Sequence, residues 1–135
     1  MKLTLPNDIE QIPKLSEFID SICETFCIDM ETTMSLNLAL EEAVVNVMSY
    51  AYPEGTKGDV DIEVVKGPQY LDFIISDSGK PFNPTTKEDP DTNLSVEERP
   101  IGGLGIHIIR QIMDSVHYER KENRNYLTLR KIFIN

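Results

Sequence analysis

The middle of the chain reads LNLALEEAVVNVM at residues 36–48, and this stretch says more about the architecture than any other. Its apolar side chains cover most of the circumference of a helix, which predicts a helix over residues 31–51 that is buried on more than one side. The polar exceptions near its centre are Glu41, Glu42 and Asn46. Because residues four apart lie on the same side of a helix, Glu42 and Asn46 project together.

The pair formed by Glu42 and Asn46 has two interpretations. Its side chains are either solvated at the edge of the helix or face a cavity. In a cavity, the amide oxygen of Asn46 suits Mg2+, and the Glu42 carboxylate can orient or deprotonate an attacking hydroxyl group. The helical spacing alone is compatible with both interpretations.

The sequence on either side of this helix predicts a two-layer domain. Apolar residues recur every three or four positions before it and alternate with polar ones after it, which indicates one more helix and then strands. The predicted elements are a strand at 2–6, a helix at 9–26 capped by Asn7 or Asp8, the central helix capped by Asp29, a hairpin of strands at 59–66 and 69–76, an irregular segment from 78 to 101, a helix from Ile106 to about Asp114, and strands near 116–121 and 125–134 joined by a turn at 122–125.

This order of elements predicts an α+β fold, a two-layer sandwich in which three helices cover one face of a mostly antiparallel sheet. At 135 residues, the chain has the length of one ordinary domain, and we expect a single domain over residues 1–135. Cys23 and Cys27 lie four apart and are placed in one predicted helix, the first of the chain, and we expect two small buried or half-buried thiols.

The charge of the chain limits its partners. It carries 23 acidic against 13 basic side chains, a net charge of -10. Such a chain repels phosphate backbones, so we expect neither nucleic acid nor a membrane surface as a partner. ATP could still bind where Mg2+ and backbone N–H groups offset the repulsion. The N-terminus has no apolar segment typical of a signal peptide, so we expect a cytoplasmic protein.

Two further segments carry chemistry. Asp77-Ser78-Gly79 follows directly on a predicted strand, where the carboxylate can accept a hydrogen bond from an exocyclic amine and the glycine lets a flat ring approach the backbone. The cluster at residues 102–105 has three glycines and precedes a helix, an arrangement that can direct N–H groups toward a phosphate. A plain turn and a flexible hinge are the respective alternatives.

These segments resemble, in the same order, the boxes of the GHKL ATPases, the superfamily of gyrase, histidine kinases and mismatch-repair ATPases. Residues 40–46 resemble the N box, residues 77–84 the G1 box and residues 102–106 the G2 box. Within the superfamily, the short length, the Pro81-Phe82 variant and the closing strand are most similar to the anti-sigma-factor serine kinases. The resemblance implies the Bergerat ATP-binding fold.

The resemblance also implies roles for individual residues. Asn46 would be the Mg2+ ligand and Glu42 the general base, with Glu41, one position away, as the alternative base. Asp77 would hold the adenine amine, and Gly79 would give room for the ring. The rest of the nucleotide site would comprise Phe82, Gly102, Gly103, Leu104 and Gly105, with residues 83–101 as the ATP lid.

The chain departs from the family pattern at three places. Tyr50 stands where the family often has a histidine, four residues after Asn46. The Gly-x-Gly form of the G1 box is replaced by Gly79-Lys80-Pro81. Arg99, a candidate for touching the terminal phosphate, is separated from the glycine cluster by two residues. ATP binding depends less on these positions than catalytic turnover does.

The resemblance therefore implies an ATP- and Mg2+-dependent protein-serine/threonine kinase, an anti-sigma regulatory factor that phosphorylates an anti-anti-sigma partner of the STAS type. It also implies a sigma factor as a second partner and a homodimer. The alternative is a nucleotide-gated protein-binding module with little or no kinase activity. The ATPase half of a histidine kinase fits less well, because no pair of helices with a phosphoacceptor histidine precedes the domain.

Overall fold

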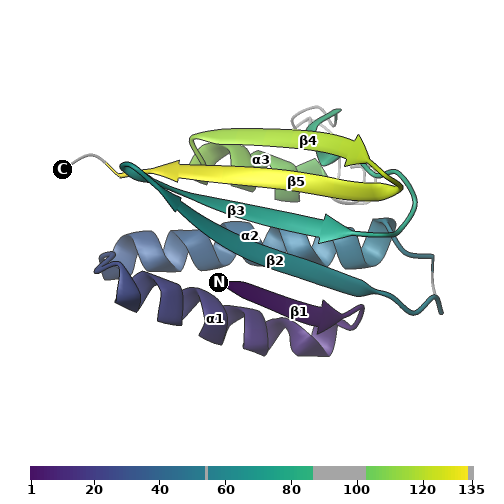
Figure 1. Ribbon diagram of the computed structural model, residues 1–135, viewed down its shortest axis with the longest axis horizontal. Coiled ribbons are helices and arrows are strands. Elements are labelled where there is room, and N and C mark those ends of the chain that lie inside the picture. Colours follow the sequence, from purple (N-terminus) through teal and green to yellow (C-terminus); the bar gives the residue numbers. More distant parts are fainter. Residues whose placement is uncertain (54, 87–102, 134–135) are drawn as a thin grey trace.

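A computed structural model of the protein describes residues 1–53, 55–86 and 103–133. The described residues form five strands and three helices (Figure 1). In order they are β1 (Lys2–Pro6), α1 (Ile12–Thr25), α2 (Met30–Tyr50), β2 (Asp59–Gly67), β3 (Tyr70–Asp77), α3 (Gly103–Ile112), β4 (Ser115–Lys121) and β5 (Arg124–Ile132), with short 3-10 turns at Ile9–Gln11 and Pro84–Thr86.

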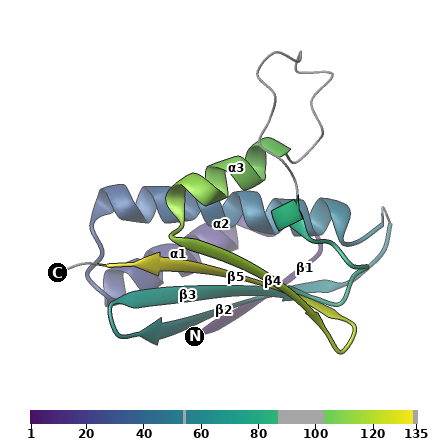
Figure 2. The same ribbon diagram turned by 90° about the horizontal axis from the view of Figure 1, so that it is seen from above.

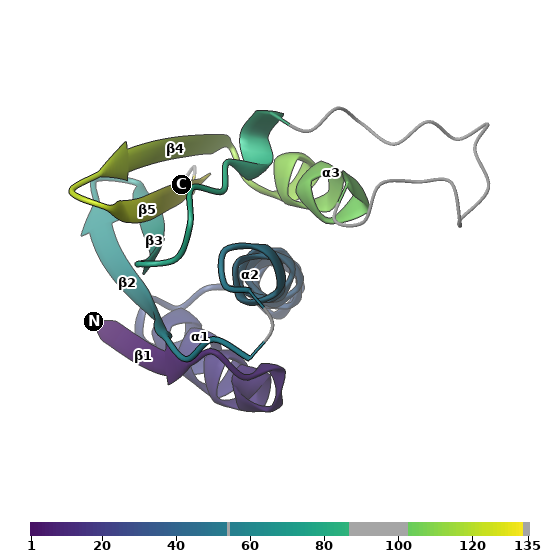
Figure 3. The same ribbon diagram turned by 90° about the vertical axis from the view of Figure 1, so that its right-hand side faces the viewer.

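The five strands form one sheet in the order β1-β2-β3-β5-β4, and every neighbouring pair is antiparallel. All three helices lie on the same face of the sheet (Figure 3). The predicted α+β two-layer architecture is therefore confirmed. The register places Asp77, the last residue of β3, opposite Asn125 in β5. This pairing joins two segments that lie far apart in the sequence.

Helix α2 runs through the middle of the helical layer, with α1 on one side and α3 on the other (Figure 3). This central place explains why apolar residues surround most of its circumference, since three neighbours have to be packed. Its buried side chains meet those of α1, α3 and the inner face of the sheet in a single core. The largest fully buried members of this core include Leu36, Leu40, Ile62, Phe73, Ile75, Ile106 and Leu129.

The predicted helix caps are present. The Asp8 side chain accepts from the backbone N–H of Glu10 at 3.0 Å, at the start of the 3-10 turn that leads into α1. The Asp29 side chain accepts from the backbone N–H of Thr32 at 2.8 Å and caps α2. Each carboxylate satisfies an N–H group that has no partner within its own helical turn.

Three predictions about local structure were wrong. Cys27 lies beyond the end of α1, with φ at +55° and an exposed side chain, whereas Cys23 is buried in the helix. Helix α3 begins at Gly103 and not at Ile106, so two of the clustered glycines belong to its first turn. The turn between β4 and β5 consists of Glu122 and Asn123 alone, both at positive φ, as the twist of a two-residue hairpin requires.

Part of the predicted irregular segment falls outside the described residues. Of the segment assigned as ATP lid, only residues 83–86 are described, and Arg99 and Gly102 are among those that are not. No helix of the described chain has the length and apolar character needed to cross a bilayer.

Candidate functional site

The polar pair of α2 lies at the edge of the helix that faces α3. Asn46 is buried, with 7% of its surface exposed, and Glu42 is half-buried one turn before it. Glu41 faces the other way, because the Ser16 hydroxyl on α1 donates to its carboxylate at 2.7 Å. The two adjacent carboxylates thus meet different neighbours, Glu41 on α1 and Glu42 at the start of α3. Only Glu42 shares a side with Asn46.

Helix α3 brings its first turn against this pair, and it lies along α2 (Figure 2). A Cβ atom placed on Gly105 would lie 2.8 Å from Nδ2 of Asn46 and 3.0 Å from Oε2 of Glu42. Any other side chain at this position would fill the space beside both groups. The first N–H groups of a helix have no partner within it and carry its positive dipole end, so this turn suits an anion.

The loop after β3 lies against the end of α2. The N–H of Lys80 donates to the carbonyl oxygen of Ala51 at 2.8 Å. A Cβ atom on Gly79 would come within 2.3 Å of the same carbonyl oxygen, and a backbone atom at that place cannot move aside cheaply. Gly79 is therefore required for the loop to pass this close to the helix. This close approach to α2 also keeps the loop beside Asp77, whose Oδ1 accepts from the N–H of Gly79.

Asp77 is held in one orientation at the end of β3, where it is 1% exposed. Its Oδ1 accepts from the N–H of Gly79 at 2.8 Å and from Nδ2 of Asn125 at 2.9 Å. Both of these hydrogen bonds fall on one oxygen. The second carboxylate oxygen is thus the one suited to recognise an amine.

Burial raises the pKa of the Asp77 carboxyl above its ordinary value, because the charged form loses hydration. Hydrogen bonds from Asn125 and from the N–H of Gly79 oppose this effect and lower the pKa, as do the positive charges of Arg124 and Arg120. Burial is the largest of these effects. A carboxylate that is costly to bury and held by several donors is typical of a ligand-binding position.

Asn125 was predicted both as the last residue of the turn and as the first residue of the closing strand; it is a buried residue of β5 and connects the parts of this site. Its Nδ2 donates to Asp77 and also to the carbonyl oxygen of Lys80 at 2.8 Å. Its Oδ1 accepts from the N–H of Phe82 at 3.3 Å and from the side chains of Tyr118 and Arg120. Asn125 therefore ties β3, β4 and the loop over residues 79–82 together.

Arg120 adds a second contact between β4 and the loop. Its Nη1 donates to the carbonyl oxygen of Gly79 at 2.8 Å and to Oδ1 of Asn125 at 3.2 Å. The sequence contains no motif that would have identified Asn125 or Arg120. The only available signal is the alternation of β5, which puts Asn125 on the same face as Leu127 and Leu129.

Phe82 and Tyr50 form an aromatic pair between the loop and α2. Their ring centroids are 5.5 Å apart and the ring planes meet at 79°, an edge-to-face arrangement. Tyr50 is one turn beyond Asn46 on α2. It therefore fixes the loop relative to the helix that carries the polar pair.

We expect Asn125→Ala to destabilise the fold by about 2–3 kcal/mol, because a buried carboxylate and a backbone carbonyl would each lose a donor. Urea denaturation measures this loss. Thr128→Ala, on the opposite face of the same strand, is the matched control and should change stability by less than about 0.5 kcal/mol. If Asn125→Ala is as stable as the control, the connecting role assigned to Asn125 is wrong.

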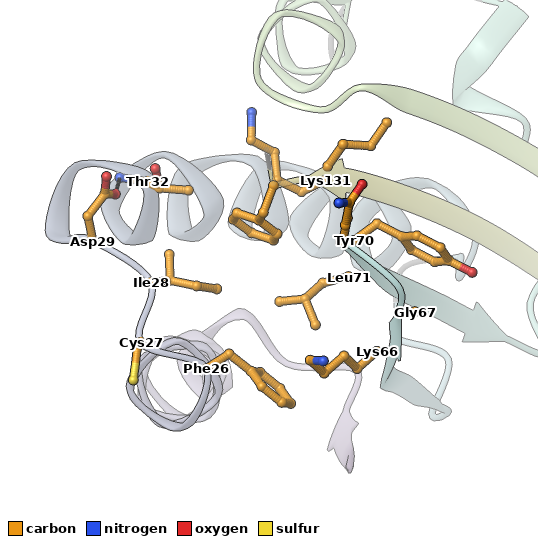
Figure 4. A pocket seen from close by; sticks show the side chains of 13 residues that line it. Phe26, Cys27, Ile28, Asp29, Thr32, Lys66, Gly67, Tyr70, Leu71 and Lys131 are labelled. Atoms are coloured by element: carbon orange, nitrogen blue, oxygen red, sulfur yellow. Dashed lines mark hydrogen bonds between the residues drawn. The ribbon is translucent and has the colours of Figure 1, made fainter. Parts of the chain in front are cut away.

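A cavity of about 510 Å³ lies at the other end of the sheet (Figure 4). Its lining comes from the loop between α1 and α2, the hairpin of β2 and β3, and the end of β5. Tyr70, at the start of β3, lines it, whereas Asp77 ends the same strand. At about 3.3 Å per residue, the two sites are separated by roughly 20 Å. Among the described residues, none of the predicted site residues lines this cavity.

The predicted residues thus form two groups joined by α2. Glu42, Asn46 and Gly105 make a polar cradle at the start of α3, and Asp77 and Gly79 make a second cradle at the end of β3. Gly103 lies in the same first turn of α3, and the side chain of Leu104 is not described. An anionic group with a divalent cation fits the first cradle. A flat ring with an exocyclic amine fits the second.

Comparison with known families gives a match over almost the whole chain. The family described as "Histidine kinase-like ATPase domain" matches residues 5–131. In the solved structures, the histidine kinase domain of a blue-light activated histidine kinase from Erythrobacter litoralis is similar, with a TM-score of 0.55 and 13% identity. The match covers 96% of this chain and 62% of that chain. At this identity, the likeness concerns the fold.

Similar curated proteins include several protein kinases. The chain is 27% identical to serine/threonine-protein kinase BtrW of Bordetella bronchiseptica, over 70% of this chain and 67% of that protein. It is 32% identical to serine-protein kinase RsbW of Bacillus mycoides, over 77% of this chain and 65% of that protein. It is 31% identical to serine-protein kinase RsbW of Bacillus subtilis, over 70% of this chain and 59% of that protein. In both RsbW comparisons, the match spans less than two thirds of the relative.

Proposed function

Because the chain belongs to the histidine kinase-like ATPase domain family, we propose that it is an ATP- and Mg2+-dependent protein-serine kinase. Its substrate would be a small anti-anti-sigma protein of the STAS type, and nucleotide state would decide which partner it holds. The kinases RsbW and BtrW among the similar proteins support this proposal. So does the grouping of the predicted residues into two cradles.

The cradle at β3 is proposed to bind adenine. Oδ1 of Asp77 is engaged by Gly79 and Asn125, so the other oxygen would accept from the exocyclic amine of the base. The absence of a side chain at Gly79 would let the ring lie against the loop. Phe82, fixed by Tyr50, would border the same space. These contacts would orient the nucleotide with its phosphates toward α3.

The cradle at α3 is proposed to bind the phosphates. The N–H groups of Gly103 and Gly105, in the first turn of the helix, would donate to phosphate oxygens, with Gly102 and Leu104 as neighbours in the same segment. The amide oxygen of Asn46 would be the protein ligand of Mg2+, which in such sites takes its other ligands from phosphate and water. Mg2+ would neutralise charge on the transferred phosphoryl group.

Glu42 is proposed to act on the acceptor hydroxyl. Its carboxylate would take the proton from a serine of the partner while the serine oxygen attacks the terminal phosphorus and ADP leaves. The observation that carries this assignment is the 3.0 Å approach of Oε2 of Glu42 to the Cβ position of Gly105. Glu41 is a poor candidate for the base, because its carboxylate is bonded to Ser16 on α1.

The second candidate function is a nucleotide-gated binding module without turnover. The observation that favours it is the packing of Tyr50 on Phe82, at the position where the family resemblance leads us to expect a histidine. Under either function, we propose a cytoplasmic homodimer with a sigma factor as a further partner. The net charge of -10 argues against nucleic acid and anionic membranes as partners.

Incubation with radiolabelled ATP, Mg2+ and a purified STAS-type anti-anti-sigma protein tests the proposed function. We expect label on a serine of the partner, with transfer that stops when EDTA removes Mg2+. A partner in which that serine is replaced by alanine is the control and should stay unlabelled. If the chain binds ATP and partner but transfers no label, the binding-module function is correct and the kinase function is wrong.

A further inference from the structure

Helix α2 exposes a row of large apolar side chains in its first half, before Glu42 and Asn46. Met30 is 79% exposed, Met34 is 67% exposed and Leu38 is 44% exposed. They are spaced by four residues and so follow one another along the helix surface. We call these three residues the α2 ridge. In the described chain, the other large apolar side chains with similar exposure are scattered over other elements: Met1, Ile9, Val65 and Ile132.

The core does not require the α2 ridge. The helix already buries its opposite side, where Leu36, Leu40 and Val44 are each 0% exposed. Exposed apolar residues that occur singly need no explanation, but a row along one helix marks a contact surface. Methionine is common on surfaces that adapt to a protein partner.

The α2 ridge leads directly to Glu42. Leu38 is four residues before Glu42 on α2, a separation of about 6 Å along the axis at 1.5 Å per residue. Met34 lies a further turn back. A folded protein that offers a hydroxyl group to Glu42 has to rest on the surface next to this carboxylate. The α2 ridge is an apolar part of that surface.

The surroundings of the α2 ridge are acidic. Residues 12–50, which comprise α1 and α2, contain seven acidic side chains and a single lysine. Glu31 is exposed on α2 itself, directly after Met30. The exposed Asp20 of α1 lies against α2, because its carboxylate accepts from Nδ2 of Asn37 at 2.9 Å. A partner that fits this surface has an apolar patch with lysine or arginine at its border. Such complementarity steers association and favours one orientation of the partner.

We propose that the α2 ridge is the docking surface for the serine-bearing protein substrate. This inference rests on the proposed function, since it places the partner next to the carboxylate that would act on its hydroxyl group. The partner buries Met34 and Leu38, and its basic border faces the acids of α1 and α2. Docking on α2 leaves the adenine cradle at β3 untouched.

The test compares M34Q/L38Q with wild type in the labelling assay with the purified STAS-type protein. Glutamine keeps the helix, because its helix propensity is close to that of leucine and methionine. We expect kcat/KM for the partner to fall about tenfold or more through KM, because two apolar contacts at an interface are lost. The affinity for a fluorescent ATP analogue should stay within about twofold, since the nucleotide cradles are intact.

The matched control is V65T/I132T, which changes two apolar residues of the sheet that are 44% and 45% exposed. It should leave KM for the partner unchanged. If M34Q/L38Q has the KM of wild type, the docking surface lies elsewhere. If M34Q/L38Q also loses affinity for ATP, the α2 ridge is needed for the folded structure of the nucleotide site, and the proposal is overturned. A change from dimer to monomer with unaltered KM assigns the ridge to a second copy of the chain, which also overturns it.

Failure of the kinase function is recognised separately. If wild type binds the STAS-type protein without labelling it, the same variants are compared by equilibrium binding. Binding about tenfold weaker for M34Q/L38Q then supports the α2 ridge, and equal binding overturns it. If wild type does not bind the STAS-type protein at all, both this partner class and its docking surface are wrong.

Discussion

Glu42→Gln is expected to lower the rate of phosphoryl transfer by about 100- to 10,000-fold, the usual contribution of a general base. The amide keeps the size of the side chain beside Gly105 but cannot take a proton. ATP affinity should change by less than about threefold, because Asp77 and the first turn of α3 are untouched. Single-turnover labelling of the partner measures transfer, and titration with a fluorescent ATP analogue measures binding.

Glu41→Gln is the control for this variant, since it makes the same chemical change one residue away. Its carboxylate accepts from the Ser16 hydroxyl on α1, and a glutamine oxygen can still accept that hydrogen bond. We expect normal transfer and a change in stability below about 1 kcal/mol. If Glu42→Gln labels the partner at the normal rate, or if Glu41→Gln is the inactive variant, the base has been assigned to the wrong residue.

Asp77→Asn is expected to weaken ATP binding by about 100-fold, because a charge-assisted hydrogen bond is lost and an amide donor would face the adenine amine. The asparagine oxygen can still accept from Gly79 and Asn125, so the loop over residues 79–82 should keep its place. Isothermal titration with ATP and with GTP measures the effect. An affinity for ATP equal to that of wild type would show that Asp77 does not recognise the base.

The same variant should be at least as stable as wild type at neutral pH. The pKa of Asp77 is raised in the folded protein, chiefly by burial, so the folded state holds the proton more tightly than the unfolded state. In the unfolded state Asp77 has an ordinary pKa of about 3.9. The free energy of unfolding of wild type therefore falls as the pH rises from this value through the raised pKa of the folded state. Asparagine does not titrate, so its advantage should grow over this interval and then level off. Urea denaturation between pH 4 and pH 8 measures the difference.

Much of the architecture was predictable because its causes are local. The apolar circumference of α2, the Asp8 and Asp29 caps and the alternation of the strands each depend on residues within one or two turns or a few strand positions. The shared side of Glu42 and Asn46 follows from helical spacing alone. The end of a strand at Asp77 follows from strand alternation, which stops there before a serine and a glycine.

The first turn of α3 and the place of Asn125 were not predictable in this way. Three glycines in four residues suggested a loop, and the packing of α3 on α2 extends the helix back into them. Asn125 stood at the boundary between the predicted turn at 122–125 and the predicted strand at 125–134. The positive φ angles of Glu122 and Asn123 close the hairpin earlier and put Asn125 in the strand.

Helical and strand periodicity therefore established which side chains share a face of one element, including the proposed metal ligand and the proposed base. Periodicity could not establish which other helix or strand packs against each of these faces. Glu41 and Glu42 are adjacent and chemically alike, and only the packing of α1 and α3 on opposite sides of α2 distinguishes them. Likewise, Asn125 reaches Asp77 through a register that joins residues 48 positions apart. Such contacts depend on the whole core, because no local spacing specifies them.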